Sequence, residues 1–371
     1  SKVPWTPPGD RLSTGMGQNL SRFQSGTSVG TSQARSAGMG QYHITRVEDP
    51  CIRLFIYLSI ADRTVGLGGP AGAPMAYPNL FLIGAPKTGT TALARWLKEH
   101  PEIYFSEIKE PWFFSKIHSG ITSWDEYLKL FSYAQPEHRF VAEGSPTYME
   151  ERAAPIISKH FPDSSFIVIL RNPTDMAISL HSQQLKNGNE EYLNFQDAWA
   201  DSISATYKLS NSVRPYNTNY LLRCRLGQQL YNLKQDIPNH RIKIAFYDDL
   251  AYRPQQFYIN ILEFLDLNFD GRVDFTKENT RKTVRNELLY WSSTILGKRV
   301  GRIKRALGVQ GSGKGRLRKL RDKSMQSGEQ DIPSATLESM RREFADEIDL
   351  IEKYTGRDLS SWKLQHSVYE V

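Results

Sequence analysis

Cysteine is scarce in this chain of 371 residues, which contains only Cys51 and Cys224. Two cysteines cannot build a disulfide framework or a cysteine-based zinc site, so the composition favours a reducing compartment. Long apolar runs are also missing. The nearest candidate, "CIRLFIYLSIA" (51–61), contains Arg53 and is shorter than the roughly 20 residues that span a bilayer. With no basic stretch at its start, the chain predicts no signal peptide, no transmembrane segment and a cytoplasmic location of bacterial type.

Strong net charge is lacking as well. The formal net charge is +7 and the isoelectric point is about 9.2. This balance favours an anionic ligand but is too small to indicate nucleic acid, which is not among the expected partners. Hydrophobic residues make up 39% of the chain and charged residues 23%, as in a globular protein with a substantial core.

Residues 1–74 differ in composition from the rest. They hold 11 of the 26 glycines, many serines and no sustained apolar period, which predicts a disordered tail. Met75 directly precedes the first convincing strand, so one hypothesis is an over-extended reading frame; a regulatory or stem segment is the alternative. We therefore predict a tail over residues 1–74 and a single folded domain over residues 75–371.

From residue 79 onward, apolar strands alternate with amphipathic helices. The predicted strands are "NLFLIGA" (79–85), "SSFIVILR" (164–171) and "RIKIAFYDDL" (241–250). The predicted helices are "TALARWLKEH" (91–100), "PQQFYINILEFLDL" (254–267) and residues 334–354. The apolar helix containing Cys224 is expected to place that residue in the core. This alternation predicts an α/β fold, a P-loop-like doubly wound parallel sheet flanked by helices.

The turn "GAPKTGTT" (84–91) joins the first predicted strand to the first helix. It offers glycines for close backbone approach, one lysine and three threonines: Gly84, Gly89, Lys87, Thr88, Thr90 and Thr91. Backbone N–H groups at a helix N-terminus bind anions, so the turn is a candidate phosphate site. It departs from the Walker motif, because Lys87 precedes Gly89 by two positions instead of following it. A purely structural turn is the alternative.

A second anion site follows the strand that ends at Leu170. Arg171 lies at its carboxyl end, the same sheet edge as Lys87, and Ser179 comes eight residues later on the following helix. An arginine can grip a phosphate with two parallel N–H bonds, and a serine hydroxyl can complete the site. Two anion sites on one edge suggest a ligand with two separated phosphate groups.

These motifs resemble the two nucleotide signatures of PAPS-dependent sulfotransferases, in their bacterial and heparan-sulfate-type branch. The resemblance rests on "APKTGTTAL" and "LRNPTDMAISLHSQ", followed in family order by "GKGRLRK" and "GRDLSSW", with "EIKEPWFF", "EGSPTYM" and "AFYDDL" at their expected places. It covers residues 79–362. Each motif is weak alone, but the ordered set is specific. PAPS is 3′-phosphoadenosine 5′-phosphosulfate, and its product is PAP.

The resemblance implies roles for named residues. The 5′-phosphosulfate would be bound by Lys87, Thr88, Gly89, Thr90 and Thr91, and the 3′-phosphate by Arg171, Ser179, Lys314, Gly315 and Arg316. Residues 298–323 contain 11 Lys or Arg against one acid, Asp322, which we interpret as an anion-binding lid. A solvated face or a nucleic-acid strip is the alternative, but no aromatic residues interleave with the charges.

The resemblance also identifies Glu110 as the base that takes the acceptor's hydroxyl proton, with Lys87 stabilising charge on the leaving oxygen and no metal. His118 and His181 are rival bases, and His118 ranks second. Residues expected near the acceptor are Lys109, Trp112, His118, Glu143 and Ser145. For each of these a structural role is the alternative: a solvated lysine, a core aromatic or a simple turn.

Three departures from heparan-modifying members limit the substrate prediction. Gly144, Trp112 and Pro86 stand where a basic residue, a histidine and an arginine are usual. Fewer basic groups favour a small sugar, a lipid-linked glycan or a natural-product alcohol over a highly sulfated polysaccharide. Two other functions stay open: a P-loop kinase, disfavoured by the shifted lysine and a missing magnesium-binding aspartate, and a non-catalytic binder of anionic glycans that uses residues 298–323.

Overall fold

The computed structural model describes residues 76–118, 120–204, 215–276, 282–306, 319, 321–328 and 330–364. The predicted tail over residues 1–74 lies outside these ranges. So does the predicted lid contact of Lys314, Gly315 and Arg316.

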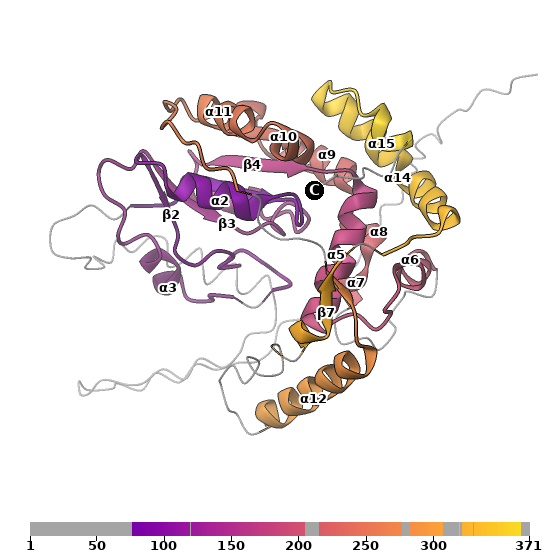
Figure 1. The fold of residues 1–371 in the computed structure, drawn as a ribbon. Helices are drawn as coiled ribbons and strands as arrows, with labels where there is room; N and C mark the ends of the chain where they lie inside the picture. Colours follow the sequence, from indigo (N-terminus) through magenta and orange to yellow (C-terminus); the bar gives the residue numbers. More distant parts are fainter. Residues whose placement is uncertain are drawn as a thin grey trace, which may run out of the picture. The chain divides into compact units, whose positions relative to one another are not determined.

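The centre of the fold is a parallel sheet of five strands in the order β2-β3-β1-β4-β5 (Figure 1). Their bounds are β1 Leu80–Gly84, β2 Ile103–Phe105, β3 Phe140–Gly144, β4 Ser165–Leu170 and β5 Ile242–Phe246. All four pairings between neighbouring strands are parallel. The sheet confirms the predicted α/β class and the strands expected at 79–85 and 164–171.

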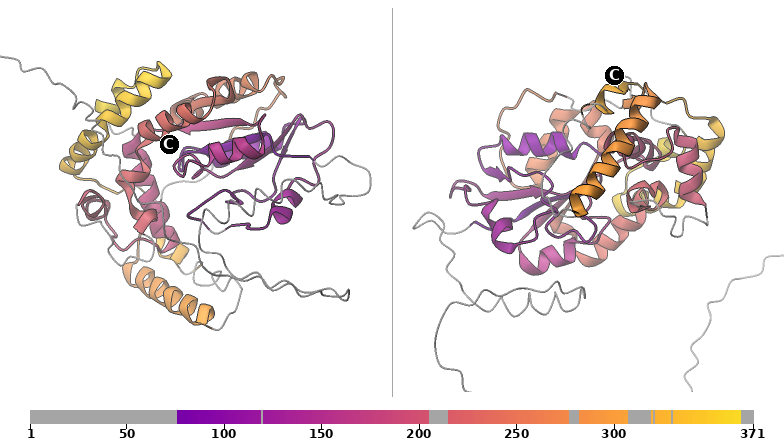
Figure 2. Two further views of the ribbon diagram at one scale, coloured as in Figure 1. Left: turned by 180° about the vertical axis from the view of Figure 1, so that it is seen from behind. Right: turned by 90° about the horizontal axis from the view of Figure 1, so that it is seen from below.

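Helices cover both faces of this sheet. Successive residues of a strand point to opposite faces, so one strand contributes side chains to two apolar clusters. Ile167 and Ile169 of β4 pack with α2 (Thr90–Lys98) and α11 (Pro254–Phe264) in one apolar cluster. Phe166, Val168 and Leu170 face the other cluster, which includes side chains of α5, α9 and α14. In Figures 1 and 2, α14 (yellow) lies against α9 and α5, in agreement with the contacts between these helices.

The remaining elements lie around this framework. Their bounds are α3 Trp124–Lys129, α4 Ala154–His160, α5 Pro173–Asn187, α6 Phe195–Ile203, α7 Pro215–Thr218, α8 Tyr220–Arg223, α9 Leu226–Asp236, η2 Asn239–Arg241, α10 Tyr247–Tyr252, α12 Glu287–Ala306, α14 Ser334–Thr355 and α15 Ser360–Leu364. A small antiparallel pair is formed by β6 (Lys282–Val284) and β7 (Met325–Ser327). Within the described ranges, no helix combines the length and apolarity that a membrane crossing requires.

Two sequence-based boundaries were wrong. The strand predicted over residues 241–250 ends at Phe246, and α10 begins at Tyr247, where Asp248 and Asp249 favour a helix N-terminus. The helix predicted around Cys224 is broken there into α8 and α9, although Cys224 is buried as expected. Strands β2 and β3 were not predicted. The first has only three residues, and the second contains a glutamate and a glycine that weaken its strand pattern.

Candidate active site

The β1–α2 turn has the backbone that an anion site needs. Lys87 and Gly89 both have positive φ angles, of 65° and 86°. A Cβ atom on Gly89 would lie 2.8 Å from the Leu250 Cδ1 atom. Both this close contact and the positive φ angle disfavour a side chain at this position. The Thr88 hydroxyl donates to the Ala85 carbonyl oxygen over 2.6 Å and ties the turn together. No side chain caps α2 at Gly89, which leaves the N–H groups of the first helical turn available to an anion.

Arg171 connects the two predicted anion sites directly. Its guanidinium donates from Nη1 to the Lys87 carbonyl oxygen over 2.9 Å and lies 4.2 Å from the centre of the Tyr247 ring. Its side chain is buried, with 5% exposed. The Asn172 side chain accepts from the Thr174 N–H over 3.0 Å and begins α5, the helix on which the buried Ser179 lies. The carboxyl ends of β1 and β4 thus present Lys87 and Arg171 side by side.

The electrostatics of the turn are unusual for a lysine. The pKa of Lys87 is lowered to about 8, first by burial and then by the nearby cations Arg171, Lys186 and Lys109; Glu110 acts in the opposite direction. A site that crowds cations around a partly buried lysine is electrostatically incomplete without an anion. Lys186, in the last turn of α5, was missed by the sequence analysis, because a lysine at a helix end normally has a capping role.

Lys109 and Glu110 face the same turn from the segment after β2. The Lys109 ammonium donates to the Thr91 hydroxyl over 3.0 Å and to the Glu110 carboxylate over 2.9 Å. The two charged side chains are 28% and 34% exposed, so this pair is accessible to a substrate. Lys109 therefore connects Glu110, predicted as the base, to Thr91 of the predicted phosphate turn.

The segment that carries Glu110 has a strained backbone. Glu110 and Trp112 have φ angles of 64° and 50°, values that non-glycine residues rarely adopt. The Glu110 N–H donates to the Gly144 carbonyl oxygen over 3.0 Å, and the Trp112 N–H donates to the Ser145 hydroxyl over 3.3 Å. Ser145, expected near the acceptor, therefore binds the backbone of this segment.

The three aromatic residues after Glu110 have different surroundings. Phe114 is buried in the core, and Phe113 stacks on Tyr127 with ring centres 4.3 Å apart. Trp112 instead stacks on His118, with centres 4.9 Å apart. The core interpretation of these aromatics thus fits Phe113 and Phe114. Trp112 and His118 are both partly buried and form a stacked aromatic pair within the Glu110 segment.

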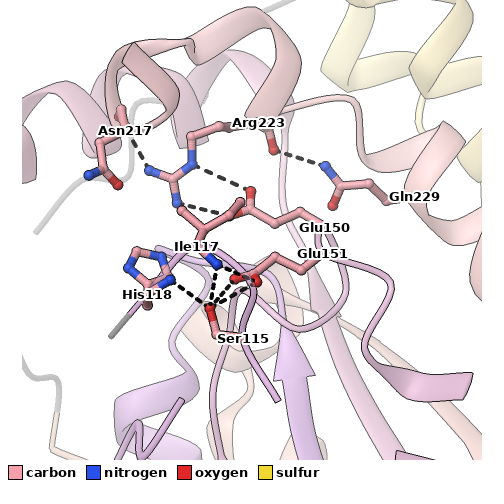
Figure 3. Close-up of polar contacts among 8 residues, drawn as sticks. All are labelled: Ser115, Ile117, His118, Glu150, Glu151, Asn217, Arg223 and Gln229. Carbon is pink, nitrogen blue, oxygen red and sulfur yellow. Dashed lines mark hydrogen bonds and ion pairs between the residues drawn. The ribbon is translucent and has the colours of Figure 1, made fainter. Parts of the chain in front are cut away.

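A polar cluster fixes the end of this segment, as Figure 3 shows. The Ser115 hydroxyl donates to the Glu151 carboxylate over 2.8 Å. Glu151 also accepts the N–H of Lys116, which the figure does not draw, over 2.7 Å. The His118 N–H donates to the Ser115 hydroxyl over 2.8 Å. The backbone around His118 is thereby held in place.

Arg223 and Glu150 form a buried ion pair above this cluster in Figure 3. Their side chains are each 4% exposed, and the nearest N–O distance is 3.3 Å. The Arg223 guanidinium also lies 5.3 Å from the centre of the Tyr216 ring, which in turn makes an edge contact with His118. No local sequence pattern predicts this pair, because the two residues are 73 positions apart in separate elements.

Two sequence candidates lie in the interior. His181 is buried, contacts the Tyr192 carbonyl oxygen over 2.9 Å, and has a pKa lowered to about 4 by burial. It acts as a neutral core residue. Glu143 is wholly buried near the carboxyl end of β3, and burial raises its pKa to about 8. Its side chain cannot touch an acceptor without a rearrangement of the core.

Carboxylates at the sheet edge are engaged with the protein itself. Asp248 accepts from the Trp362 indole over 2.8 Å, and Asp249 pairs with Arg357 and Arg253. In the part of the chain that the structure describes, no group of three or more His, Cys, Asp or Glu side chains is arranged to hold a metal ion.

The chain belongs to the sulfotransferase family, whose model matches residues 78–271. These residues include the β1–α2 turn, the Glu110 segment, Arg171 and α5. The family match confirms the sulfotransferase resemblance read from the sequence.

Individual relatives match over shorter stretches. Human heparan sulfate glucosamine 3-O-sulfotransferase 6 is 32% identical over 125 residues, which are 32% of this chain and 35% of that protein. The membrane-associated sulfotransferase kil1 of Dictyostelium discoideum is 31% identical over 111 residues, 29% of this chain and 23% of that protein. Human bifunctional heparan sulfate N-deacetylase/N-sulfotransferase 2 is 26% identical over 199 residues, 51% of this chain and 22% of that protein. The matches thus span about a fifth to a third of these relatives.

The fold is shared with a solved sulfotransferase. The crystal structure of a sulfotransferase from Alicyclobacillus acidocaldarius aligns with a TM-score of 0.57 at 21% identity and covers 78% of this chain and 99% of that one. At this identity the likeness concerns the fold.

Proposed function

We propose that this protein transfers the sulfuryl group of PAPS to a hydroxyl group of an acceptor. The observation that carries the proposal is the hydrogen bond from the Arg171 guanidinium to the Lys87 carbonyl oxygen, which brings two basic residues from adjacent strand ends together at one edge of the sheet. A nucleotide with phosphates at its 3′ and 5′ ends needs two such groups. The helix N-terminus at Thr90 and the lowered pKa of Lys87 support anion binding at the same place.

The residues of the site can divide the chemistry between them. PAPS supplies the sulfuryl group. Glu110, exposed and 2.9 Å from the Lys109 ammonium, accepts the acceptor's hydroxyl proton as its oxygen attacks. Lys87 and the first-turn N–H groups of α2 stabilise negative charge on the leaving phosphate oxygen. Arg171 and Ser179 hold the 3′-phosphate and fix the direction of attack, with Lys314, Gly315 and Arg316 as further candidates for that contact.

The acceptor proposed is a carbohydrate or a small natural-product alcohol. Two of the relatives act, by their names, on heparan sulfate, which supports a sugar. The Trp112–His118 stack within the Glu110 segment offers an aromatic surface, a common partner for one face of a sugar or lipid ring. The Arg223 guanidinium near Tyr216 is paired with Glu150, and the Lys109 ammonium is paired with Glu110, so these two cations are already neutralised, which favours a neutral over a highly sulfated acceptor.

The test is calorimetric titration of the full chain with 3′,5′-adenosine bisphosphate, which is PAP, and with ATP plus magnesium as comparator. We expect the bisphosphate to bind more tightly than ATP, and Lys87→Ala and Arg171→Ala each to weaken it strongly. Incubation with PAPS and a panel of sugars and alcohols, followed by mass spectrometry, then identifies the acceptor by a gain of one sulfate.

Two results would contradict the proposal. Preference for magnesium ATP would favour the kinase alternative. Binding of anionic glycans that survives Lys87→Ala, without nucleotide binding, would favour a non-catalytic glycan binder.

A further inference from the structure

The strained Glu110 segment depends on the turn after β3. Three backbone N–H groups donate to that turn: Glu110 to the Gly144 carbonyl oxygen over 3.0 Å, Trp112 to the Ser145 hydroxyl over 3.3 Å, and Phe114 to the Tyr148 hydroxyl over 3.1 Å. Every second residue of the segment is thus anchored. Two of these anchors are side-chain hydroxyls, so they can be removed by substitution without changing the backbone.

A buried acid lies directly beneath these anchors. Glu143 precedes Gly144, and its partner in the sheet register is Phe81 of β1, so it points to the face where the apolar core lies. The hydroxyls of Tyr127 and Tyr148 approach its carboxyl group, although neither forms a well-aligned bond to it within the described part of the chain. No described cation pairs with it. A carboxyl group in the core without a cation is costly, so a role beyond packing is indicated.

Tyr148 links this acid to the segment. Tyr148 is buried, and its hydroxyl accepts the Phe114 N–H. The side chains of Glu143 and Ser145 also interact with this hydroxyl. Tyr127 touches the same acid and is equally buried, but its ring packs on Phe113 and its hydroxyl makes no described contact with the segment's backbone. Of the two hydroxyls, that of Tyr148 has a described hydrogen bond to the backbone of the segment and that of Tyr127 does not.

We propose that Glu143 and Tyr148 are positioning residues that help to hold the Glu110 segment in its strained conformation through the Phe114 amide, next to the Ser145 hydroxyl that holds the Trp112 amide. Their effect on the reaction rests on the proposed function, in which Glu110 is the base. A carboxylate displaced by about 1 Å loses much of its catalytic effect, so loosening the segment lowers the rate without touching the nucleotide site. The acid acts from inside the core and does not contact substrate.

The decisive comparison is Tyr148→Phe against Tyr127→Phe in the full chain. Hydrogen–deuterium exchange of peptides covering residues 109–118 reports the anchoring and needs neither cofactor nor acceptor. We expect the segment in Tyr148→Phe to exchange at least about tenfold faster than in wild type, because the Phe114 N–H loses its acceptor. In Tyr127→Phe the rate should stay within about twofold. Equal exchange in the two variants would overturn the proposal.

Glu143 is tested with a conservative and a truncating variant. Glu143→Gln keeps the shape and a polar group beside Tyr148, so its segment should exchange as in wild type, whereas Glu143→Ala should resemble Tyr148→Phe. With PAPS and the acceptor from the panel, kcat should fall about tenfold in Tyr148→Phe and Glu143→Ala while KM for PAPS stays within about twofold. Rescue of kcat by Gln at position 143 is expected.

The outcomes separate the two proposals. If the exchange difference appears but the wild type neither binds PAP nor transfers sulfate, the positioning of the segment stands and the proposed function fails. If the wild type transfers sulfate but the two tyrosine variants lose kcat equally, the positioning proposal fails and the function stands.

Discussion

The guanidinium of Arg171 donates to the carbonyl oxygen of Lys87 over 2.9 Å while lying 4.2 Å from the centre of the Tyr247 ring. The contact joins the end of β4 to the turn after β1 and is supported by the first residue of α10. One arginine thus shapes the phosphate turn and faces the proposed 3′-phosphate. A lysine in its place would retain the charge but lose the planar fork and its stacking.

Arg171→Lys should therefore weaken PAP binding about tenfold to a hundredfold, the range expected for one charge-assisted hydrogen bond. The measurement is the dissociation constant from calorimetry. Arg241→Lys is the matched control. Arg241 also donates to a backbone oxygen, that of Ser164 over 2.7 Å, and lies 5.7 Å from the Phe166 ring, but at the other end of β4. A similar loss of affinity in both variants would show that the effect is one of general stability.

The protonation of Lys87 should make nucleotide binding depend on pH. Its pKa is lowered to about 8 by burial and by Arg171, Lys186 and Lys109, so part of the free protein carries a neutral lysine at mildly alkaline pH. A bound phosphate raises this pKa, so protons are taken up on binding and affinity falls as pH rises above about 8.

Calorimetry of PAP binding at about pH 8.5 in two buffers of different ionisation enthalpy measures this proton uptake. Lys87→Arg, which stays charged, should abolish it. An observed enthalpy of the wild type that is the same in both buffers would contradict the prediction.

Replacing the proposed base should separate chemistry from binding. Glu110→Gln should lower kcat for sulfate transfer about a hundredfold to ten-thousandfold, because the amide cannot accept the acceptor's proton. The affinity for PAP should change little. Glu107→Gln is the control: Glu107 also pairs with a lysine, Lys98, over 2.7 Å, but is 68% exposed and lies away from the turn. A fully active Glu110→Gln variant would contradict Glu110 as the base and favour His118.

Glu143 should make the protein's stability depend on pH. Its pKa is raised to about 8 by burial, against an ordinary value of 4.5, so the folded state holds a proton that the unfolded state releases. The stability from this group is present below about pH 4.5 and is lost as pH rises through about 8.

Glu143→Gln removes this titration. Relative to wild type it should be more stable at pH 8 than at pH 5 by roughly 3–4 kcal/mol, measured by denaturant unfolding at each pH. Glu126→Gln, at the exposed start of α3, should leave the difference between the two pH values unchanged. If the free energy of unfolding changed equally with pH in Glu143→Gln and in wild type, that result would argue against a protonated acid at this position.

The buried Arg223–Glu150 pair should contribute far more than a surface pair. Both side chains are 4% exposed, so Arg223→Met leaves an unpaired carboxylate in the interior and should cost about 3–5 kcal/mol. Arg152→Met removes an ion pair with Asp236 in which the arginine is 54% exposed, and should cost about 1 kcal/mol or less. Thermal unfolding of the two variants makes the comparison, and equal costs would be inconsistent with a desolvated pair.

Parts of this protein followed from local sequence. The run at 164–171 is apolar on both faces because β4 has a packed cluster on each side, so its pattern alone identified a central parallel strand. Gly89, expected to permit close backbone approach, has a positive φ, and the ordered set of motifs that contains Lys87 and Arg171 supported the family resemblance that the family match confirms. These signals are local or depend only on order along the chain.

Other parts depended on contacts between distant residues. The short strand β2 and the polar residues of β3 carry no strand pattern of their own, and they form because neighbouring strands supply their hydrogen bonds. The sequence analysis predicted Glu143 as a candidate substrate contact. Its pairing with Phe81 in the sheet places its side chain on the core face, where it is buried. The approach of Lys186 to Lys87 and the pairing of Arg223 with Glu150 were equally hidden.

The sequence by itself determined the α/β class, the glycine-containing turn between β1 and α2 and the family, because strand and helix periods, glycine positions and motif order are properties of the chain. The tertiary structure alone decided which charges meet, which acid is buried and which backbone amides hold the Glu110 segment. Those properties follow from distances and dielectric surroundings, which arise only when residues far apart in the sequence pack together.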